Sequence, residues 1–204
     1  MARTPKVVED RRDQIVDAAM RVFAQKGFTR ATNKDIAREA GITPGLIYYY
    51  FESKEALLKA IIETRSPIRL MRSLPQQVFA LPPEAFLRFM IQQILNIVEG
   101  ENFVSMIRVL LPEIVHGSDP HIAGLAGNTL QRIIGFLSSY LETKIATGEL
   151  RPVDASLTAQ TIFGGIVGFV LRRQILQDPV ALAYTPEQIA NAIAETVLPG
   201  LLQR

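Results

Sequence analysis

Apolar residues recur along most of this 204-residue chain with the three-to-four-residue spacing of amphipathic helices. The first such stretch, residues 9–26, places a single stripe of apolar side chains on one helical face, formed by Ile15, Ala18, Ala19, Val22 and Phe23. Glycine at position 27 is typical of the residue that ends a helix. The pattern therefore predicts a first helix that buries one face.

Residues 32–54 contain two short helical patterns separated by a glycine turn. Thr32 is a favourable N-cap, and Gly41 stands where a residue with positive φ would end the helix. Thr43 followed by Pro44 is an N-cap with proline at the first helical position, which predicts that a second helix begins at once. Two short helices joined in this way form a helix-turn-helix, whose second helix normally enters the DNA major groove.

Three consecutive tyrosines, Tyr48, Tyr49 and Tyr50, follow on this second helix. Neighbouring side chains on a helix differ in direction by about 100°, so the three cannot all point into a core. At least one hydroxyl must therefore reach solvent or a polar partner, and DNA phosphate oxygens are natural acceptors. A buried Tyr48 that bridges two helices is an alternative reading, because tyrosine often combines an apolar body with a polar tip.

A further helix begins after Ser53 and is expected to end or kink before Pro67. Irregular structure is expected from there through Pro82 and Pro83. The chain then divides into residues 1–52 for a basic arm and a helix-turn-helix domain, 53–74 for a linker helix, and 75–204 for a larger helical domain.

The larger domain is predicted to hold five helices, over residues 83–99, 102–116, 120–147, 154–176 and 186–198. The fold class is therefore all-α. Pro112 is expected to distort the last turns of its helix. Gly164 and Gly168, one turn apart, indicate close backbone approach to a neighbour. Two slim apolar helices at the end suit a four-helix seam between two subunits. An intrachain core is the alternative, and Gly164 and Gly168 could instead line a ligand cavity.

Composition narrows the class of protein further. Without cysteine, disulfides and thiolate metal sites are excluded. The N-terminus lacks the apolar core of a signal peptide, and the longest apolar run, residues 162–171, is too short to cross a membrane. We therefore expect a cytoplasmic protein with no membrane partner. The net charge is only +2, but the basic excess lies in the N-terminal part, where residues 1–8 are expected to form a mobile basic arm or, as an alternative, a disordered, solvated terminus.

The N-terminal quarter resembles the DNA-binding domain of the tetracycline-repressor (TetR) family in both residue type and spacing. The resemblance is carried by Phe23, Ala24, Gly27, Phe28, Ala31, Thr32, Ile36, Ala37, Ala40, Gly41, Ile42, Thr43, Gly45, Ile47, Tyr48, Tyr50, Phe51, Lys54 and Leu57. It departs at Tyr50, where the family often has histidine. The resemblance implies a homodimeric transcriptional regulator, usually a repressor, whose C-terminal domain binds a small molecule and whose linker helix couples the two domains.

Site residues follow from chemistry and from matched positions. A phosphate contact is expected from Thr32, through its hydroxyl and backbone N–H. The resemblance implies further phosphate contacts from Tyr48 and Lys54. The resemblance implies that the groove-facing residues are Thr43, Pro44, Gly45 and Tyr49, with Tyr50 beside them in the DNA-binding set. The best donors for purine edges are Asn33 and Lys34.

A ligand pocket in the larger domain is expected to be mostly apolar with a few polar groups. The polar candidates are Asn96, Arg108, His116, Gln131 and Tyr140, each of which has a structural role as its alternative. The wall candidates are Phe89, Phe103, Met106, Phe136 and Phe163, which favour a small hydrophobic or aromatic effector. His116 and His121 lack the carboxylate neighbours of a metal site, and no cofactor is expected.

The leading hypothesis is a dimeric, ligand-responsive repressor that binds a palindromic double-stranded operator. An activator of the same family is an alternative that sequence does not separate from it. A small helical enzyme or carrier is a third hypothesis, but the chain has no glycine-rich phosphate loop, nucleophile–base spacing or metal cluster to support it.

Overall fold

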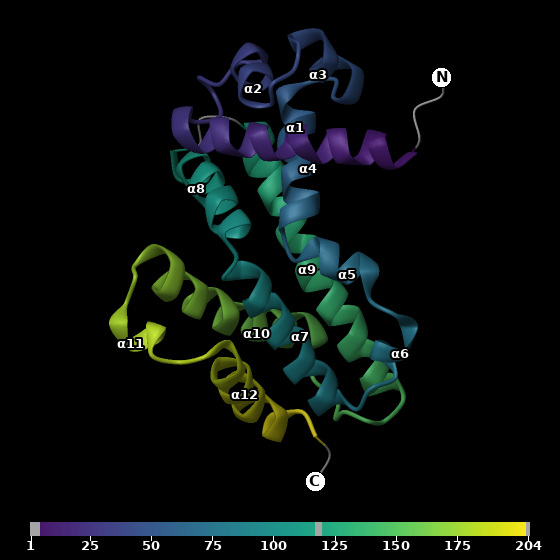
Figure 1. The fold of residues 1–204 in the computed structure, drawn as a ribbon. Helices are drawn as coiled ribbons and strands as arrows, with labels where there is room; N and C mark the ends of the chain where they lie inside the picture. Colours follow the sequence, from purple (N-terminus) through teal and green to yellow (C-terminus); the bar gives the residue numbers. More distant parts are fainter. Residues whose placement is uncertain (1–4, 117–119, 203–204) are drawn as a thin grey trace. The chain divides into compact units, whose positions relative to one another are not determined.

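A computed structural model describes residues 5–116 and 120–202 of the chain, and the described part is helical apart from turns and an isolated bridge between Leu150 and Leu202 (Figure 1). The all-α prediction is therefore confirmed. The chain forms two compact units. One contains the chain up to Ser66 together with Asn102–Asn128, and the other contains Pro67–Glu101 together with the chain from Thr129 onward.

Among the described residues, five helices and the start of a sixth build the first unit. They are α1 (Pro5–Lys26), α2 (Asn33–Glu39), α3 (Pro44–Tyr50), α4 (Lys54–Arg65) and α8 (Glu101–His116), joined by the first residues of α9 (Pro120–Ala146). Gly27 and Gly41 have φ of 78° and 64°, and these positive angles end α1 and separate α2 from α3. The helix ends predicted at Gly27 and Gly41 are thus confirmed.

One hydrophobic core holds the first unit together. Phe23 of α1, Ile36 of α2, Ile47 of α3 and Leu57 of α4 are each at most 1% exposed and belong to this core. The rings of Phe23 and Phe28 meet edge to face, with their centroids 5.1 Å apart. This core packs against the inner side of the helix-turn-helix and holds it in place. The residues on its exposed side therefore do not have to contribute to stability.

The second unit contains the remaining helices: α5 (Ile68–Ser73), α6 (Gln76–Phe79), α7 (Pro83–Val98), most of α9, α10 (Ala155–Val170), α11 (Pro179–Leu182) and α12 (Pro186–Val197). A π-helical turn, Leu171–Ile175, extends α10 and carries the buried Arg173. This guanidinium pairs with Glu99 and donates hydrogen bonds to the carbonyl oxygens of Ala181 and Tyr184. Arg173 thereby ties the end of α7 and the α11 segment to the extension of α10.

Several details differ from the sequence-based expectations. Helix α1 already includes Pro5–Val8, where the sequence predicts a mobile basic arm, and residues 1–4 lie outside the described part. The expected irregular stretch after Pro67 contains α5 and α6, because proline at an N-cap or first-turn position can begin a helix. Pro112 lies inside α8 without ending it. Residues 102–128 pack in the first unit, although the sequence places them in the larger domain. The division of the chain into a DNA-binding domain, a linker helix and a ligand-binding domain stays a prediction.

The segment Ala155–Ile175 forms a 21-residue helical stretch with a mean hydropathy of 1.3 over its most apolar window. By length and composition alone this helix could cross a membrane, and it is longer than the ten-residue apolar run from which the sequence predicts no membrane span. The helix exceeds this run because it also includes residues 155–161, which carry no charge although several of them are polar. Only 17% of the window is buried within the chain.

Candidate functional site

Thr32 is the N-cap of α2 and forms a reciprocal capping box with Asp35. The Thr32 hydroxyl oxygen accepts a bond from the Asp35 backbone nitrogen (3.2 Å), and the Asp35 carboxylate accepts from the Thr32 hydroxyl (2.8 Å) and backbone N–H (3.2 Å). The Lys26 ammonium lies 2.6 Å from the same carboxylate. These contacts, that of Lys26 above all, lower the pKa of Asp35 to about 2, so it is ionised at neutral pH.

Both donors that the sequence assigns to a DNA phosphate are therefore bound to Asp35 in this structure. The side chain of Thr32 fixes the start of α2, and the predicted phosphate contact would require the cap to open. In this structure the Thr32 side chain therefore positions α2, the helix that precedes α3.

Helix α3 presents one buried and one open face. Ile47 is fully buried, whereas Tyr48 and Tyr49 are 61% and 76% exposed. Thr43, Pro44 and Gly45, at the N-terminus of the helix, are also exposed, and Thr43 makes no side-chain capping bond. The alternative of a buried Tyr48 is wrong for this structure, since the ring lies in solvent. The open side of α3 therefore carries five of the residues predicted to face the groove or a phosphate: Thr43, Pro44, Gly45, Tyr48 and Tyr49. Tyr50 is the exception.

Tyr50 is half-buried against the core of the first unit, and its ring meets that of Tyr49 edge to face, with centroids 5.1 Å apart. Its hydroxyl is buried and has no hydrogen-bond partner among the described residues. Tyr50 therefore supports the exposed ring of Tyr49. On α2, Lys34 is exposed, while Asn33 is half-buried with its side-chain oxygen covered and without a described partner.

Lys54 connects α4 to the segment between α1 and α2. Its ammonium donates to the carbonyl oxygens of Phe28 (2.9 Å), Thr29 (3.3 Å) and Ala31 (3.0 Å) and lies 4.7 Å from the centre of the Phe28 ring. A lysine has three N–H donors, so all of them are occupied. The phosphate contact implied by the resemblance stays a prediction, and the observed role is to hold the chain that leads into α2.

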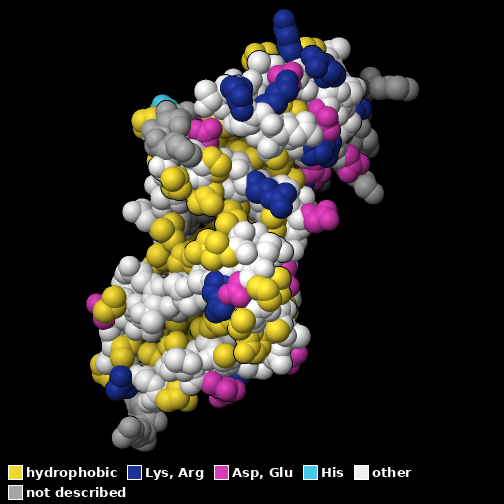
Figure 2. Space-filling view, turned by 90° about the vertical axis from the view of Figure 1, so that its left-hand side faces the viewer, with side chains coloured by type: hydrophobic (Ala, Val, Ile, Leu, Met, Phe, Trp, Pro, Cys, Tyr) yellow, Lys and Arg dark blue, Asp and Glu magenta, His cyan; other side chains and the backbone are white. Residues whose placement is uncertain are grey.

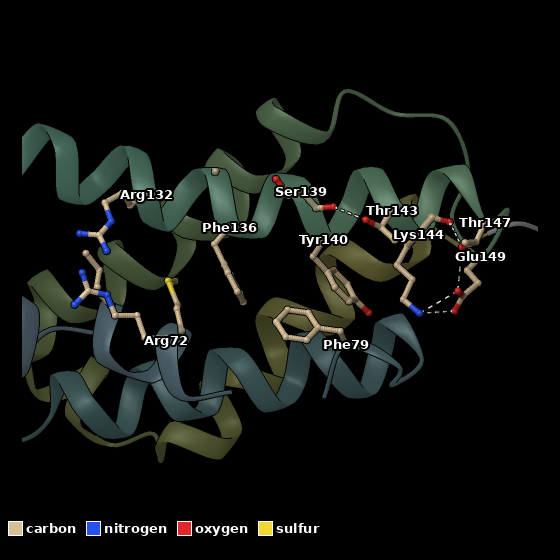
Figure 3. Close-up of a pocket in the computed structure, with 13 residues that line it drawn as sticks. Arg72, Phe79, Arg132, Phe136, Ser139, Tyr140, Thr143, Lys144, Thr147 and Glu149 are labelled. Carbon is tan, nitrogen blue, oxygen red and sulfur yellow. Dashed lines mark hydrogen bonds and ion pairs between the residues drawn. The ribbon is translucent and has the colours of Figure 1, made fainter. Parts of the chain in front are cut away.

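A pocket of about 850 Å³ lies in the second unit and is called the large pocket below (Figure 3). One end carries the guanidinium groups of Arg72 from α5 and Arg132 from α9. Apolar side chains, among them Phe79 of α6 and Phe136 of α9, form the middle. The rings of Phe79 and Phe136 meet edge to face, with centroids 5.7 Å apart. The volume suits a small organic ligand.

The other end of the large pocket is polar but internally neutralised. The Lys144 ammonium lies 2.9 Å from both carboxylate oxygens of Glu149, and the Thr147 hydroxyl donates to the same group (3.0 Å). These bonds, first that from Lys144, hold the pKa of Glu149 below its usual value. Burial, and then the charge of Glu149, raise the pKa of Tyr140 above its usual value, so its phenol stays protonated and donates to the Leu81 carbonyl (3.3 Å).

A second, almost filled space adjoins the large pocket and is called the inner cavity. Its volume is only about 20 Å³, and its walls are apolar side chains from α5, α7, α9 and α10, including Ile91, Ile133 and Phe163. Met71 and Phe136 line both spaces. These two side chains therefore form the partition between the large pocket and the inner cavity.

The structure brings only some of the predicted ligand residues together. Phe136 and Tyr140 line the large pocket, and Phe163 lines the inner cavity. Residues that line neither space are Phe89, which is half-buried, and Asn96, Arg108 and Gln131, which are exposed. Phe103 and Met106 pack in the core of the first unit, because α8 belongs to that unit. The side chain of His116 lies outside the described part.

Sequence reasoning missed Arg72, Arg132, Lys144 and Glu149 because it looked for single polar residues within apolar helices. One signal was available. Arg132, Phe136, Tyr140 and Lys144 recur every four residues, so they share one face of α9. In the described part of the chain, no three His, Asp or Glu side chains converge as metal ligands would.

The buried helix-turn-helix support, the exposed α3 face and a separate helical unit with a ligand-sized pocket define a DNA-binding regulator of the two-domain, all-helical class. Residues 15–61 match the profile of the bacterial regulatory proteins of the tetR family. Residues 85–199 match the C-terminal domain of the AefR-like transcriptional repressors. The chain belongs to the TetR family of transcriptional regulators, with a DNA-binding helix-turn-helix and a C-terminal ligand-binding domain.

Known proteins similar to this chain agree with that assignment. The HTH-type transcriptional regulator UidR of Escherichia coli (strain K12) is 30% identical over 156 residues, which cover 74% of this chain and 75% of that protein. Two solved structures share the fold. The SmeT–triclosan complex has a TM-score of 0.77 at 20% identity, covering 95% of this chain and 92% of that one. FadR from Bacillus subtilis with stearoyl-CoA has a TM-score of 0.72 at 24% identity, covering 92% and 97%.

Proposed function

We propose that the protein is a cytoplasmic, dimeric repressor that binds a palindromic operator and is released by a small, largely hydrophobic effector. The observation that carries the DNA-binding part is the open face of α3. Tyr48 and Tyr49 are large rings in solvent, next to the exposed N-terminal residues Thr43, Pro44 and Gly45. Small residues at a helix N-terminus allow close approach to bases, and tyrosine hydroxyls can donate to phosphate oxygens.

The distribution of charge also supports DNA binding at the exposed face of α3. Lys and Arg side chains gather at the top of the view in Figure 2, where α2 and α3 lie. Lys34 and Arg38, which belong to α2, are both exposed. A basic surface beside a recognition helix attracts the phosphate backbone and makes affinity depend on salt.

Dimerisation is proposed to use α10 and α12. Leu157, Val167 and Leu171 on α10 and its extension are 62%, 43% and 45% exposed. A Cβ at Gly164 or Gly168 would meet nothing within 4 Å, so none of the described residues packs closely over the two glycines. Hydrophobic side chains also reach the surface in the lower part of Figure 2. A helix this apolar and this open suits burial against its own copy.

The dimer has a direct test. Val167→Glu and Leu171→Glu should each convert the dimer to a monomer in analytical ultracentrifugation and abolish operator binding. Leu182→Glu on α11, which replaces another exposed leucine, is the matched control and should leave the dimer intact. A monomeric wild-type protein, or dimers in both α10 variants, would contradict the proposed seam.

The effector part is supported by the aromatic middle of the large pocket, where Phe79 and Phe136 meet. The solved relatives bind triclosan and stearoyl-CoA, both with extensive apolar surface. The repressor part is supported by the match to the AefR-like repressor domain. Footprinting on DNA that flanks the gene, followed by transcription in vitro, separates repression from activation: a repressor's site overlaps the promoter and lowers transcript yield, whereas an activator raises it.

A further inference from the structure

Two neighbouring tyrosines at the end of α3 meet through their rings, although helix geometry alone does not bring them together. Side chains of consecutive helical residues diverge by about 100°, so the contact depends on the side-chain conformations of Tyr49 and Tyr50. Their ring centroids lie 5.1 Å apart with an interplanar angle of 83°, which is the edge-to-face arrangement that aromatic pairs favour. The contact is therefore a specific interaction between the two side chains.

The two rings differ in how firmly the protein holds them. Tyr50 is half-buried and packs against the core of the first unit, whereas Tyr49 is 76% exposed. The next residue, Phe51, is buried, donates its backbone N–H to the Ile47 carbonyl (2.9 Å) and has the Arg12 guanidinium 5.0 Å from its ring centre. The end of α3 therefore holds Tyr50 in place, and Tyr50 offers Tyr49 a fixed neighbour.

The hydroxyl of Tyr50 does not explain how this residue would act on DNA. Its oxygen is buried and has no hydrogen-bond partner among the described residues. Because a DNA phosphate cannot bind a hydroxyl that the protein covers, direct contact between Tyr50 and DNA would require the side chain to move first. The ring is then the part of Tyr50 that acts, and the group on which it acts is the ring of Tyr49.

We propose that Tyr50 is a positioning residue whose ring holds the Tyr49 side chain in the conformation that contacts the operator. Tyr50 thereby sets sequence selectivity without touching DNA. An exposed side chain that is ordered before binding loses less conformational entropy when it meets a base edge. This gain is restricted to DNA that Tyr49 contacts, so it raises affinity for the operator and not for unrelated sequences. The inference rests on the proposed function, because it assigns how the α3 face distinguishes DNA sequences.

A double-mutant cycle on the full-length protein tests the coupling between the two rings. Fluorescence anisotropy measures affinity for the operator that the wild-type protein selects and for unrelated DNA. Tyr50→Leu should weaken operator binding about three- to tenfold, but by less than about twofold when Tyr49 is already replaced by alanine. Its affinity for unrelated DNA should stay unchanged. Tyr50→Phe keeps the ring and should bind the operator as the wild type does, with an equal or higher Tm because it removes a buried hydroxyl without a partner.

Tyr48 supplies the matched control for the cycle. It is also exposed on α3, but no ring contact joins it to Tyr50 within the described part of the chain. In a Tyr48→Leu background, Tyr50→Leu should therefore still weaken operator binding by its full factor. A Tyr50→Leu variant that had merely loosened α3 would instead weaken binding with and without the Tyr49 ring, and would weaken unrelated DNA as well.

The ring contact is also measured without DNA, by fluorine NMR of protein labelled with fluorotyrosine. The resonance of Tyr49, assigned by its loss in Tyr49→Phe, should move toward the position of free fluorotyrosine in Tyr50→Leu, because the neighbouring ring no longer shields or deshields it. The same resonance should keep its position in Tyr48→Leu.

A loss of operator affinity in Tyr50→Phe would show that the hydroxyl contacts DNA and would overturn the proposal, even if Tyr50→Leu does not fold. Equal losses in Tyr50→Leu with and without the Tyr49 ring, or an unmoved Tyr49 resonance, would overturn it too. In these cases selective binding by the wild type leaves the proposed function intact. If the resonance moves as expected but the wild type selects no sequence, the ring contact stands, and the proposed function fails together with the role of Tyr50 in selectivity.

Discussion

Replacement of Lys54 separates two explanations of the same residue. The family resemblance implies that Lys54 contacts a DNA phosphate, whereas in the structure its ammonium binds the carbonyl oxygens of Phe28, Thr29 and Ala31. Lys54→Met keeps most of the aliphatic stem and removes the charge and all three donors. We expect this variant to lose stability and to keep the salt dependence of DNA binding.

The size of the stability loss follows from the contacts. The bonds to Phe28 and Ala31 (2.9 and 3.0 Å) contribute about 1 kcal/mol each, after a reduction for the partial exposure of the side chain. The ammonium over the Phe28 ring adds about 0.5 kcal/mol. The free energy of unfolding should therefore fall by roughly 2–3 kcal/mol, which lowers Tm by about 4–12 °C in a protein of this size.

Thermal unfolding followed by circular dichroism measures Tm. Anisotropy titrations at several salt concentrations measure the salt dependence of DNA affinity. Lys59→Met, on the exposed side of α4, is the control and should leave Tm unchanged. If Lys54 instead binds a DNA phosphate, its replacement should reduce the slope of log affinity against log salt by about 0.9. An unchanged Tm together with that flatter slope would refute the structural role of Lys54.

Three further outcomes are expected. Thr32→Ala should lower stability by about 1 kcal/mol in chemical unfolding and weaken binding to all DNA sequences alike, whereas Thr32→Ser should keep both properties. The folded state lowers the pKa of Asp35 from 3.8 to about 2. The stability that ionised Asp35 contributes is therefore complete above pH 3.8 and is lost as the pH falls toward 2. Lys26→Met should make this acid-induced loss of stability smaller, as measured by urea titrations at each pH. Arg173→Met should lower the free energy of unfolding by about 3 kcal/mol or more, and Tm with it, because the half-buried Glu99 carboxylate loses its partner. A decrease below about 1 kcal/mol would contradict this.

Most helix boundaries could be predicted because they depend on local chemistry. Thr32, Ser53, Asp154 and Thr185 accept a backbone N–H at the start of their helices, as their types and positions indicate. Glycine at position 148 has a φ of 76°, in agreement with the predicted end of α9. Each of these signals lies within a few residues of the feature that it determines.

The short helices and the pocket could not be predicted in the same way. Helix α5 has six residues and α11 has four, too few for a periodic pattern to stand out. The assignment of α8 to the first unit depends on long-range packing of Met106 and Leu110, whose apolar character fits either unit. The arginine pair of the pocket joins residues 72 and 132, and no local signal brings two such distant positions together.

The Tyr49 ring is 76% exposed, whereas Thr32 and Lys54 are bound to other groups of the chain, so α3 offers the most open of the surfaces proposed to contact DNA. The most direct measurement selects DNA from a random double-stranded pool with the full-length protein, then determines affinity, site sequence and stoichiometry. We expect a palindrome whose half-sites are one helical turn or a multiple apart, bound by two protomers, with selectivity lost in Tyr49→Ala. Recovery of no common sequence at moderate salt, or equal selection by Tyr49→Ala, would contradict it.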